Sequence, residues 1–238
     1  MSKIFDAYRK KVGGLSDLSL EIGKAGSISL YPSPTGSQKD DFNKLANRLL
    51  GLRLENRGTI LTFGSSATGE GASFVSYNTA MYLASVYHQK VVWIDANFMA
   101  PQTKLLGQDR NTFSFLLQNP DKVDDLVASD NPLLIAGGGN LQDARGLLAD
   151  RKFGQLLSNL AHRFDFVILD LPPVLNSTDT ALMAAGSDGF LLVIEQKFLK
   201  VEVIEHGIQG LRDKGVHMLG TVINRRTFDL PKVIYDRI

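Results

Sequence analysis

A short turn rich in glycine and serine separates the apolar run Thr59–Phe63 from a helical pattern that begins at Ser73. A strand, a glycine-rich turn and a helix in this order are typical of loops that bind phosphate, because backbone N–H groups and the helix N-terminus face the anion. The usual pattern is G-x-x-x-x-G-K-[ST]. Gly71 and Ser73 match its last glycine and its hydroxyl residue, but Ala72 stands at the lysine position and Ser66 at the first glycine. The sequence therefore predicts a phosphate cradle without its cation.

Two carboxylates follow apolar runs farther along the chain. Asp95 ends the run Val91–Asp95, and Asp170 ends the run Phe166–Asp170. In open α/β sheets, ligands bind at the carboxyl ends of the strands, and carboxylates there hold Mg²⁺ together with a loop hydroxyl. An aspartate after a strand can also be a helix N-cap or a turn former. Because both aspartates belong with a phosphate-type turn, we predict a metal site made of Ser73, Asp95 and Asp170.

The elements that must position these residues alternate along the chain. The candidate strands are Thr59–Phe63, Lys90–Asp95, Leu133–Ala136, Phe166–Asp170, Gly189–Glu195 and Met218–Asn224. The candidate helices are Asp40–Leu54, Ser73–Tyr87, Thr112–Leu117, Arg151–His162, Thr178–Ala185 and Lys200–Lys214. Such alternation predicts an α/β fold with a doubly wound, mostly parallel sheet and helices on both faces.

The composition is that of a globular domain. Of the 238 residues, 44% are hydrophobic and 21% are charged, which gives enough apolar surface for a sizeable core. The formal net charge is +1, so no global field favours nucleic acid or an anionic membrane. Cysteine is absent and the four histidines are scattered, which excludes disulfides and thiolate metal sites and gives no histidine ligand spacing.

The ends of the chain bear on location and domain organisation. No apolar run approaches the roughly 18 residues that cross a bilayer, and the first residues lack the apolar core of a signal peptide. We therefore expect a cytoplasmic protein whose membrane association comes through a partner. Residues 2–12 show a helical pattern and residues 13–38 are rich in Gly, Ser and Pro. We predict an N-terminal arm or linker over 1–38 and a single domain over 39–238.

Several motifs resemble those of one known family. Ser65–Ser73 is similar to the first motif of the bacterial tyrosine kinases of capsule and exopolysaccharide systems, relatives of the MinD and ParA nucleotide switches, whose usual form is S-S-x-x-G-E-G-K-[ST]. Val92–Pro101 resembles their second motif and Phe164–Leu175 their third. Gly220–Arg225 matches the late strand whose asparagine contacts adenine in relatives. The resemblance covers about residues 40–226.

The resemblance implies a P-loop-type fold and a MgATP site. The cofactor-binding residues would be Ser66, Gly69, Glu70, Gly71, Ser73, Phe74 and Asn224. Asp95 and Asp170 would take the catalytic and metal positions, with Ser73 as the third metal ligand. Relatives form rings of protomers and phosphorylate tyrosines on a C-terminal tail. They work with a membrane polysaccharide co-polymerase (Wzz-like) in the synthesis and export of surface polysaccharide.

The chain departs from the family pattern where the chemistry lies. Ala72 replaces the loop lysine and Asn97 replaces the second carboxylate of the Asp-x-Asp pair. Met99 and Ala100 stand where arginine is expected, and the tail has a single tyrosine, Tyr235. The ring-forming E-x-x-R-x-x-R motif is also altered, and its aligned residues are Asp41, Lys44 and Asn47, with Arg48 next to them. Ring formation is therefore not expected to follow the family pattern, while a dimer stays open.

These departures leave three functions to compare. The first is a kinase-like, catalytically impaired regulator or assembly factor of exopolysaccharide synthesis and export, with MgATP or MgADP bound weakly or not at all. The second is an active kinase or ATPase whose cation is relocated, with Lys104 as the candidate. The third is a ParA/MinD-like positioning factor, which the missing loop lysine and the lack of a basic DNA-binding patch disfavour. A single cation can change the rate of phosphoryl transfer by ~10³–10⁵, so position 72 favours the first function.

Overall fold

The structure is a computed structural model that describes residues 31, 33–98, 100–101, 112–126, 133–136, 146, 148 and 150–225. Contacts divide the chain into two units, Met1–Pro32 and Ser33–Ile238, and the described residues from 33 onward belong to the second. The predicted helix over 2–12, Met99, Lys104 and Tyr235 lie outside the described residues. The predicted domain boundary after residue 38 stays a prediction.

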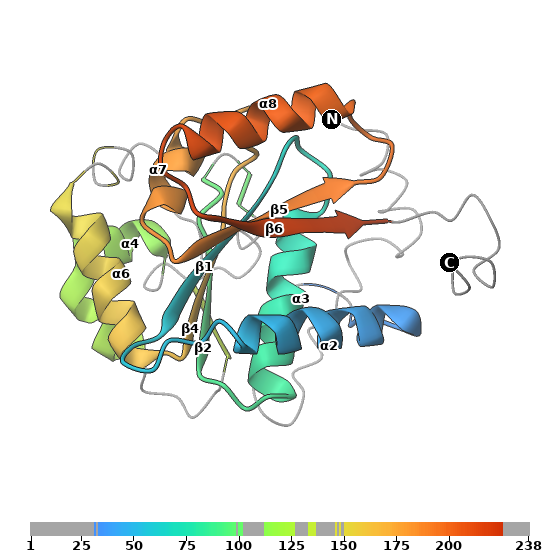
Figure 1. Cartoon of the computed structure of the whole chain (residues 1–238). Helices are drawn as coiled ribbons and strands as arrows, with labels where there is room; N and C mark the ends of the chain where they lie inside the picture. The colour runs from blue at the N-terminus through green and yellow to red at the C-terminus, as the bar shows by residue number, and fades with distance from the viewer. Residues whose placement is uncertain are drawn as a thin grey trace, which may run out of the picture. The chain divides into compact units, whose positions relative to one another are not determined.

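One sheet of six parallel strands forms the centre of the domain, in the order β3-β2-β4-β1-β5-β6 (Figure 1). The strands are β1 (Thr59–Ser65), β2 (Val91–Asp95), β3 (Leu133–Ala136), β4 (Phe166–Asp170), β5 (Gly189–Glu195) and β6 (Met218–Asn224). Every residue of β1, β2 and β4 is buried, as expected for parallel strands covered on both faces. The predicted doubly wound α/β fold is confirmed.

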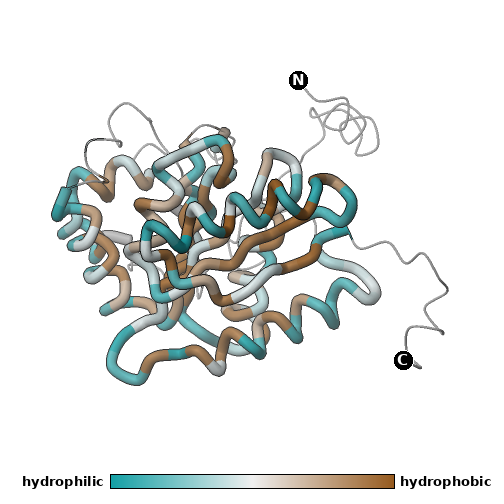
Figure 2. Tube along the Cα trace, turned by 45° about the horizontal axis from the view of Figure 1, so that its top comes forward, coloured by the Kyte–Doolittle hydropathy of each residue, from teal (hydrophilic) through white to brown (hydrophobic). Residues whose placement is uncertain are grey.

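Helices cover both faces of this sheet. They are α2 (Ser37–Leu50), α3 (Ala72–Ser85), α4 (Phe113–Gln118), α6 (Arg151–Arg163), α7 (Asp179–Ala185) and α8 (Val201–Arg212), with a 3₁₀ helix η2 (Pro120–Leu126). On one face, strand residues such as Ile60, Val167 and Phe190 form a hydrophobic core with side chains of α4, α6, α7 and α8. The hydropathy tube shows these apolar strands inside a more polar outer layer (Figure 2).

The opposite face of the sheet is covered by α3, with α2 packed outside it (Figure 1). Trp93 of β2 is fully buried there, and its ring lies edge-on to Tyr77 of α3 with a centroid distance of 5.6 Å. Phe42 joins α2 to α3 because its ring contacts both Phe74 and Tyr82, each at 5.8 Å between centroids. The helix that begins after the glycine-rich turn is therefore fixed from both sides.

The strands lie where the apolar runs predict them, whereas one helix needs a correction. The prediction placed a helix over Asp40–Leu54, but α2 spans Ser37–Leu50 and is followed by a turn at Gly51. Leu52 and Leu54 lie outside the helix and are 41% and 39% exposed, although Leu52 fits the helical period. Glycine weakens helix continuation, which explains the earlier end. Among the described residues, no helix is both long enough and apolar enough to cross a membrane.

Candidate functional site

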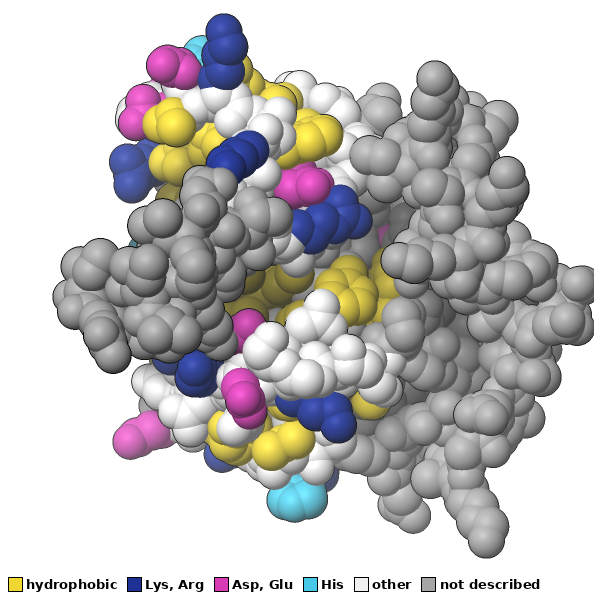
Figure 3. Space-filling model, turned by 90° about the vertical axis from the view of Figure 1, so that its right-hand side faces the viewer, with side chains coloured by type: hydrophobic (Ala, Val, Ile, Leu, Met, Phe, Trp, Pro, Cys, Tyr) yellow, Lys and Arg dark blue, Asp and Glu magenta, His cyan; other side chains and the backbone are white. Residues whose placement is uncertain are grey.

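The predicted site residues come together at the edge of the sheet where the strands end. The turn after β1 leads into α3, and the neighbouring strands end at Asp95, Asp170, Glu195 and Asn224. Asp95 and Asp170 are direct partners in the register of β2 and β4. Figure 3 faces the side on which β5 and β6 end and shows a hollow with hydrophobic side chains at its floor and charged side chains at its rim.

The turn has the backbone of an anion-binding loop. Gly69 and Gly71 have φ values of +100° and +89°, a region that side chains rarely adopt. A Cβ atom at Gly71 would lie 2.2 Å from the side-chain nitrogen of Asn224, so a larger residue cannot stand there without moving that amide. Gly71 is also the N-cap of α3 and gives this helix no side-chain cap. A helix N-terminus without a side-chain cap is a common binding place for phosphate.

Glu70 shapes the turn from inside. Its side chain is fully buried, Oε2 accepts from the backbone N–H of Ala67 at 2.7 Å, and Oε1 accepts from the backbone N–H of Glu195 at 3.2 Å. The sequence placed Glu70 among the cofactor-binding residues. In the structure both oxygens of its carboxylate accept hydrogen bonds from backbone amides of the protein itself. Ser66, another predicted cofactor-binding residue, is also buried. Glu70 therefore braces the loop against β5.

The segment after β4 supports the turn from the other side. The backbone N–H of Val174 donates to the Ser65 carbonyl at 2.8 Å, and that of Leu175 donates to the Ser66 carbonyl at 3.2 Å. The side-chain amide of Asn176 donates to the Thr68 hydroxyl at 3.3 Å. The third motif of the sequence thus holds the loop as well as supplying Asp170, a role that the sequence did not indicate.

Asp170 is a fully buried carboxylate at the end of β4. Neither of its carboxylate oxygens makes a hydrogen bond with a described residue. Burial, and then the charge of Asp95, raise the pKa of Asp170 well above its usual value, while the nearby hydroxyls of Ser73 and Ser76 act in the lowering direction. The Ser76 hydroxyl gives Asp170 little help because it donates to the Ser73 carbonyl at 3.1 Å and accepts from the indole N–H of Trp93 at 3.0 Å.

Orphaned buried oxygens of this kind fit a metal ion. Mg²⁺ is usually held by one or two carboxylates, with water and phosphate completing its octahedron. The described residues contain no group of three or more acidic or histidine side chains suited to a metal. Asp170 and Asp95, with the Ser73 hydroxyl at the start of α3, therefore suit a magnesium ion that arrives with a nucleotide better than a metal held by the protein alone.

The position of the missing lysine is the first residue of α3. Ala72 is 7% exposed and brings no charge to the turn. Asn97, at the position of the second family carboxylate, uses its side-chain oxygen to accept from the backbone N–H of Ala100 at 3.3 Å. Its own backbone N–H donates to Asp95 Oδ1 at 3.2 Å. Asn97 thus closes the turn after β2.

Two further predicted residues lie on different elements, Phe74 in the first turn of α3 and Asn224 at the end of β6. The Phe74 ring packs against Phe42 in the contact between α2 and α3, so its described ring contact is with a helix. Asn224 lies on the loop, where its side-chain amide donates to the Glu70 carbonyl at 2.9 Å. The structure thus brings Asn224 and the two glycines together and places Phe74 in helix packing.

The sequence did not indicate two charged residues beside Asn224. Arg225 Nη1 donates to the Gly69 carbonyl at 3.2 Å and to Glu195 Oε2 at 2.8 Å. Arg225 is 156 residues from Gly69 along the chain and Glu195 is 30 residues from Arg225. The neighbouring ends of β5 and β6 bring them together, so no local pattern could have predicted these contacts, although Arg225 ends the matched stretch Gly220–Arg225.

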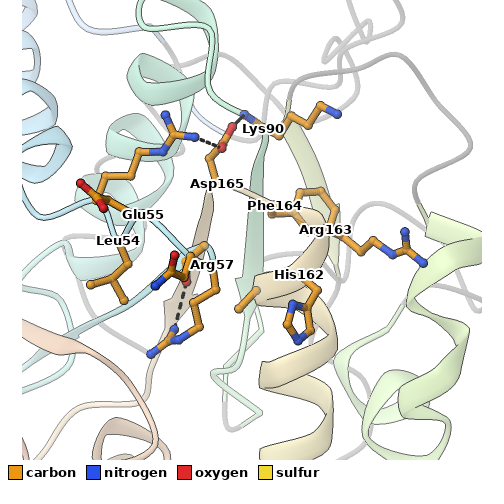
Figure 4. A pocket seen from close by; sticks show the side chains of 12 residues that line it. Leu54, Glu55, Arg57, Lys90, His162, Arg163, Phe164 and Asp165 are labelled. Atoms are coloured by element: carbon orange, nitrogen blue, oxygen red, sulfur yellow. Dashed lines mark hydrogen bonds and ion pairs between the residues drawn. The ribbon is translucent and has the colours of Figure 1, made fainter.

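A second pocket lies at the opposite, amino-terminal edge of the sheet (Figure 4). Its carboxylate Asp165 accepts from Arg53 Nη2 at 2.6 Å and from the backbone N–H of Lys90 at 2.8 Å. The side chains of Lys90 and Arg163 extend away from Asp165 (Figure 4). None of the predicted site residues lines this pocket.

Comparison with known proteins gives concordant matches. Residues 58–214 match the family model AAA_31, described as an AAA domain. The chain is 27% identical over 190 residues to the tyrosine-protein kinase CpsD of Streptococcus agalactiae, a match that covers 77% of this chain and 82% of that protein. The kinase domain of the Escherichia coli tyrosine kinase ETK has a similar structure, with a TM-score of 0.72, 22% identity and coverage of 97% and 91%. The cell division ATPase MinD of Pyrococcus furiosus is also similar, with a TM-score of 0.58 and 24% identity. This match covers 76% of this chain and 79% of that chain.

Proposed function

The chain belongs to the AAA domain family, and from this premise we propose that it is a nucleotide-binding, kinase-like protein with little or no phosphoryl-transfer activity. The observation that carries the proposal is a glycine turn and a carboxylate pair beside an uncharged first turn of α3. Gly71 and Asp170 provide the cradle and the metal-type carboxylate, while Ala72 stands in place of the cation.

The loop supports binding without strong catalysis. Gly69, Gly71 and the N-terminus of α3 would receive the phosphates, and Ser73, Asp95 and Asp170 would hold the accompanying Mg²⁺. A bound MgATP would supply the phosphoryl group. A hydrogen bond to a charged group contributes about 1.5–3 kcal/mol, so the missing lysine lowers affinity about tenfold to over a hundredfold. The same loss in the transition state can cost ~10³–10⁵ in rate, so binding survives and transfer does not.

The relatives point to the process in which the protein acts. CpsD of S. agalactiae is a tyrosine-protein kinase, and the motifs at Val92–Pro101 and Phe164–Leu175 resemble those of the capsule and exopolysaccharide kinases. We therefore place this chain in the synthesis and export of surface polysaccharide. It would act as a regulator or assembly factor at the inner face of the plasma membrane, docked on a membrane polysaccharide co-polymerase, alone or as a homo-oligomer.

Calorimetric titration of the purified chain with MgADP and MgATP, followed by incubation with MgATP and detection of phosphotyrosine, tests the proposal. We expect saturable binding of both nucleotides and no phosphotyrosine above a boiled control. Phosphotyrosine that appears with the wild-type chain and disappears with Asp170→Asn would show an active kinase and contradict the proposal.

A genetic experiment separates an assembly role from an enzymatic one. A strain that lacks the gene should lose surface polysaccharide, and the Asp170→Asn variant should restore it as well as the wild-type gene does. The matched control is a variant with the loop blocked, Gly71→Val, which should fail to bind nucleotide. Polysaccharide that returns only with the wild-type gene would mean that catalysis is required.

A further inference from the structure

The ends of β5 and β6 meet at the phosphate-type loop. The end of β6 contributes Asn224 and Arg225, and the end of β5 contributes Glu195. Their contacts reach consecutive loop residues, because Arg225 bonds the Gly69 carbonyl, Asn224 bonds the Glu70 carbonyl, and the Asn224 amide lies over Gly71. The loop is therefore tied to the ends of the strands that flank it.

Arg225 brings a positive charge to a loop that has lost its own. Its side chain is 49% exposed, and both of its side-chain contacts use the single nitrogen Nη1. No described residue accepts from its Nη2 or Nε atoms, so most of the planar fork is open to another acceptor. Guanidinium groups bind phosphate through paired, parallel hydrogen bonds, and they do so at loops where lysine would act as a point charge.

Glu195 is the present counter-ion of this arginine. Its carboxylate is 23% exposed and accepts from Arg225 at 2.8 Å, while its backbone N–H is held by Glu70. A half-exposed ion pair of this kind is weak, worth up to about a fivefold change in an equilibrium constant. A phosphate with two charges can therefore displace it.

We propose that Arg225 is the phosphate-binding cation of this loop and that it changes partner from Glu195 to the phosphates of a bound nucleotide. The inference rests on the proposed nucleotide binding and adds a cation for binding only: Arg225 follows β6 and does not take the lysine position at the start of α3, so the proposed loss of transfer stands. Glu195 then competes with the nucleotide for Arg225. The stronger the ion pair between Glu195 and Arg225 is, the more it lowers nucleotide affinity. The two residues must have effects of opposite sign.

Titration of the full chain with MgADP and with pyrophosphate tests this assignment. Arg225→Ala should weaken binding of both probes about tenfold or more, and Arg225→Lys should recover part of the loss because it keeps the charge without the fork. Glu195→Gln should strengthen binding up to about fivefold, and this gain should vanish in the double variant. Arg163→Ala is the matched control, since Arg163 is 51% exposed and paired with Asp124.

The outcomes are distinct. Wild-type binding that Arg225→Ala leaves unchanged overturns the inference alone, and so does weaker binding in Glu195→Gln. A loss confined to MgADP, with pyrophosphate unaffected, places Arg225 at the base and also overturns it. A wild-type chain that binds neither probe overturns both this inference and the nucleotide binding in the proposed function. Thermal melts of each variant establish that the chain is folded.

Discussion

The two edges of the parallel sheet differ in the hydrogen-bond partners of their aspartates. At the amino-terminal edge, Asp165 is bonded to Arg53 and to a backbone amide, and Asp188 is bonded to both terminal nitrogens of Arg57. At the carboxyl-terminal edge, Asp170 is fully buried and neither of its oxygens has a hydrogen-bond partner among the described residues. The first edge pairs both of these aspartates, and the second keeps Asp170 buried without a hydrogen-bond partner among the described residues.

The contrast distinguishes carboxylates that stabilise the fold through hydrogen bonds from a buried carboxylate that costs stability. A paired carboxylate at the edge of the sheet can link neighbouring strands. Asp188, just before β5, also accepts from the backbone N–H of Ile60 in β1 at 2.8 Å. A buried carboxylate without a partner costs stability and persists in proteins chiefly where a ligand or metal completes it. The unsatisfied state of Asp170 is therefore the structural reason to place the site at this edge.

Adding a cation to the carboxyl-terminal edge should give the largest effect. Ala72→Lys restores the residue that the loop pattern expects, at the first position of α3. We expect MgADP affinity to rise about tenfold to over a hundredfold, equivalent to about 1.5–3 kcal/mol, because the ammonium gains charged hydrogen bonds to phosphate. Isothermal titration calorimetry measures the change.

The control for Ala72→Lys places the same charge at the other end of the same helix. Ser85 is exposed and is the last residue of α3, so Ser85→Lys should leave affinity within about twofold of the wild-type chain. If both variants bind MgADP alike, long-range charge rather than the loop position governs binding, and the comparison of the two edges loses its functional meaning.

Removing a charge from the amino-terminal edge should destabilise the fold. In Asp165→Asn, the Arg53 guanidinium loses its charged acceptor and the Lys90 backbone N–H keeps at best a neutral one. We expect the free energy of unfolding to fall by about 1–2 kcal/mol, since the site is partly exposed and a charged hydrogen bond is replaced. Urea unfolding measures it, and Arg53→Ala should give a similar loss if the pair is the cause.

The corresponding change at the carboxyl-terminal edge should have the opposite sign. The pKa of Asp170 is raised, so the folded state binds its proton more tightly than the unfolded state does, and stability falls as pH rises from the ordinary aspartate pKa through the raised one. Asp170→Asn removes this pH-dependent loss and should raise the free energy of unfolding at pH values above that window. Below the ordinary pKa the two proteins should be alike.

Unfolding of the Asp170→Asn variant is best followed in parallel with Asp165→Asn at pH 5 and pH 8 without added magnesium. The gain in the Asp170 variant should be larger at pH 8 than at pH 5. A variant that is less stable than the wild-type chain at both values would show that the Asp170 carboxylate is satisfied in solution, which contradicts the contrast between the edges.

Sequence reasoning found the parts of this molecule that depend on local patterns. Buried strands such as Phe166–Asp170 are visible as apolar runs, and Gly69 and Gly71 were predicted as part of a glycine-rich turn, where the structure gives both a positive φ. The predicted end of α2 at Leu54 was wrong because the apolar period runs on to Leu52, while the helix ends at Leu50, just before Gly51. A periodic pattern records which face is apolar and does not record where the backbone stops being helical.

The sequence could predict the strand-end and loop residues of the candidate site, but not the contacts that support the loop. Asp95 and Asp170 follow from strand ends, and Ala72 is visible as a departure at a fixed position in the loop pattern. Glu70, by contrast, has the position of a ligand residue, but its carboxylate binds amides of the loop and of β5. The Arg225 contact joins residues 156 apart, and only the order of strands in the sheet makes them neighbours.

The smallest change in the free energy of unfolding should follow replacement of a carboxylate that is paired but exposed to solvent. Asp124 is paired with Arg163 at 2.7 Å, yet the two side chains are 62% and 51% exposed. Asp124→Asn should change the free energy of unfolding by less than about 0.5 kcal/mol, and 1 M salt should remove the difference, because water and ions screen exposed pairs. Urea unfolding at low and high salt measures both values. A loss as large as that of Asp165→Asn would mean that pairing alone, without partial burial, makes an aspartate structural in this fold, and the contrast between the two edges would then rest on partners only.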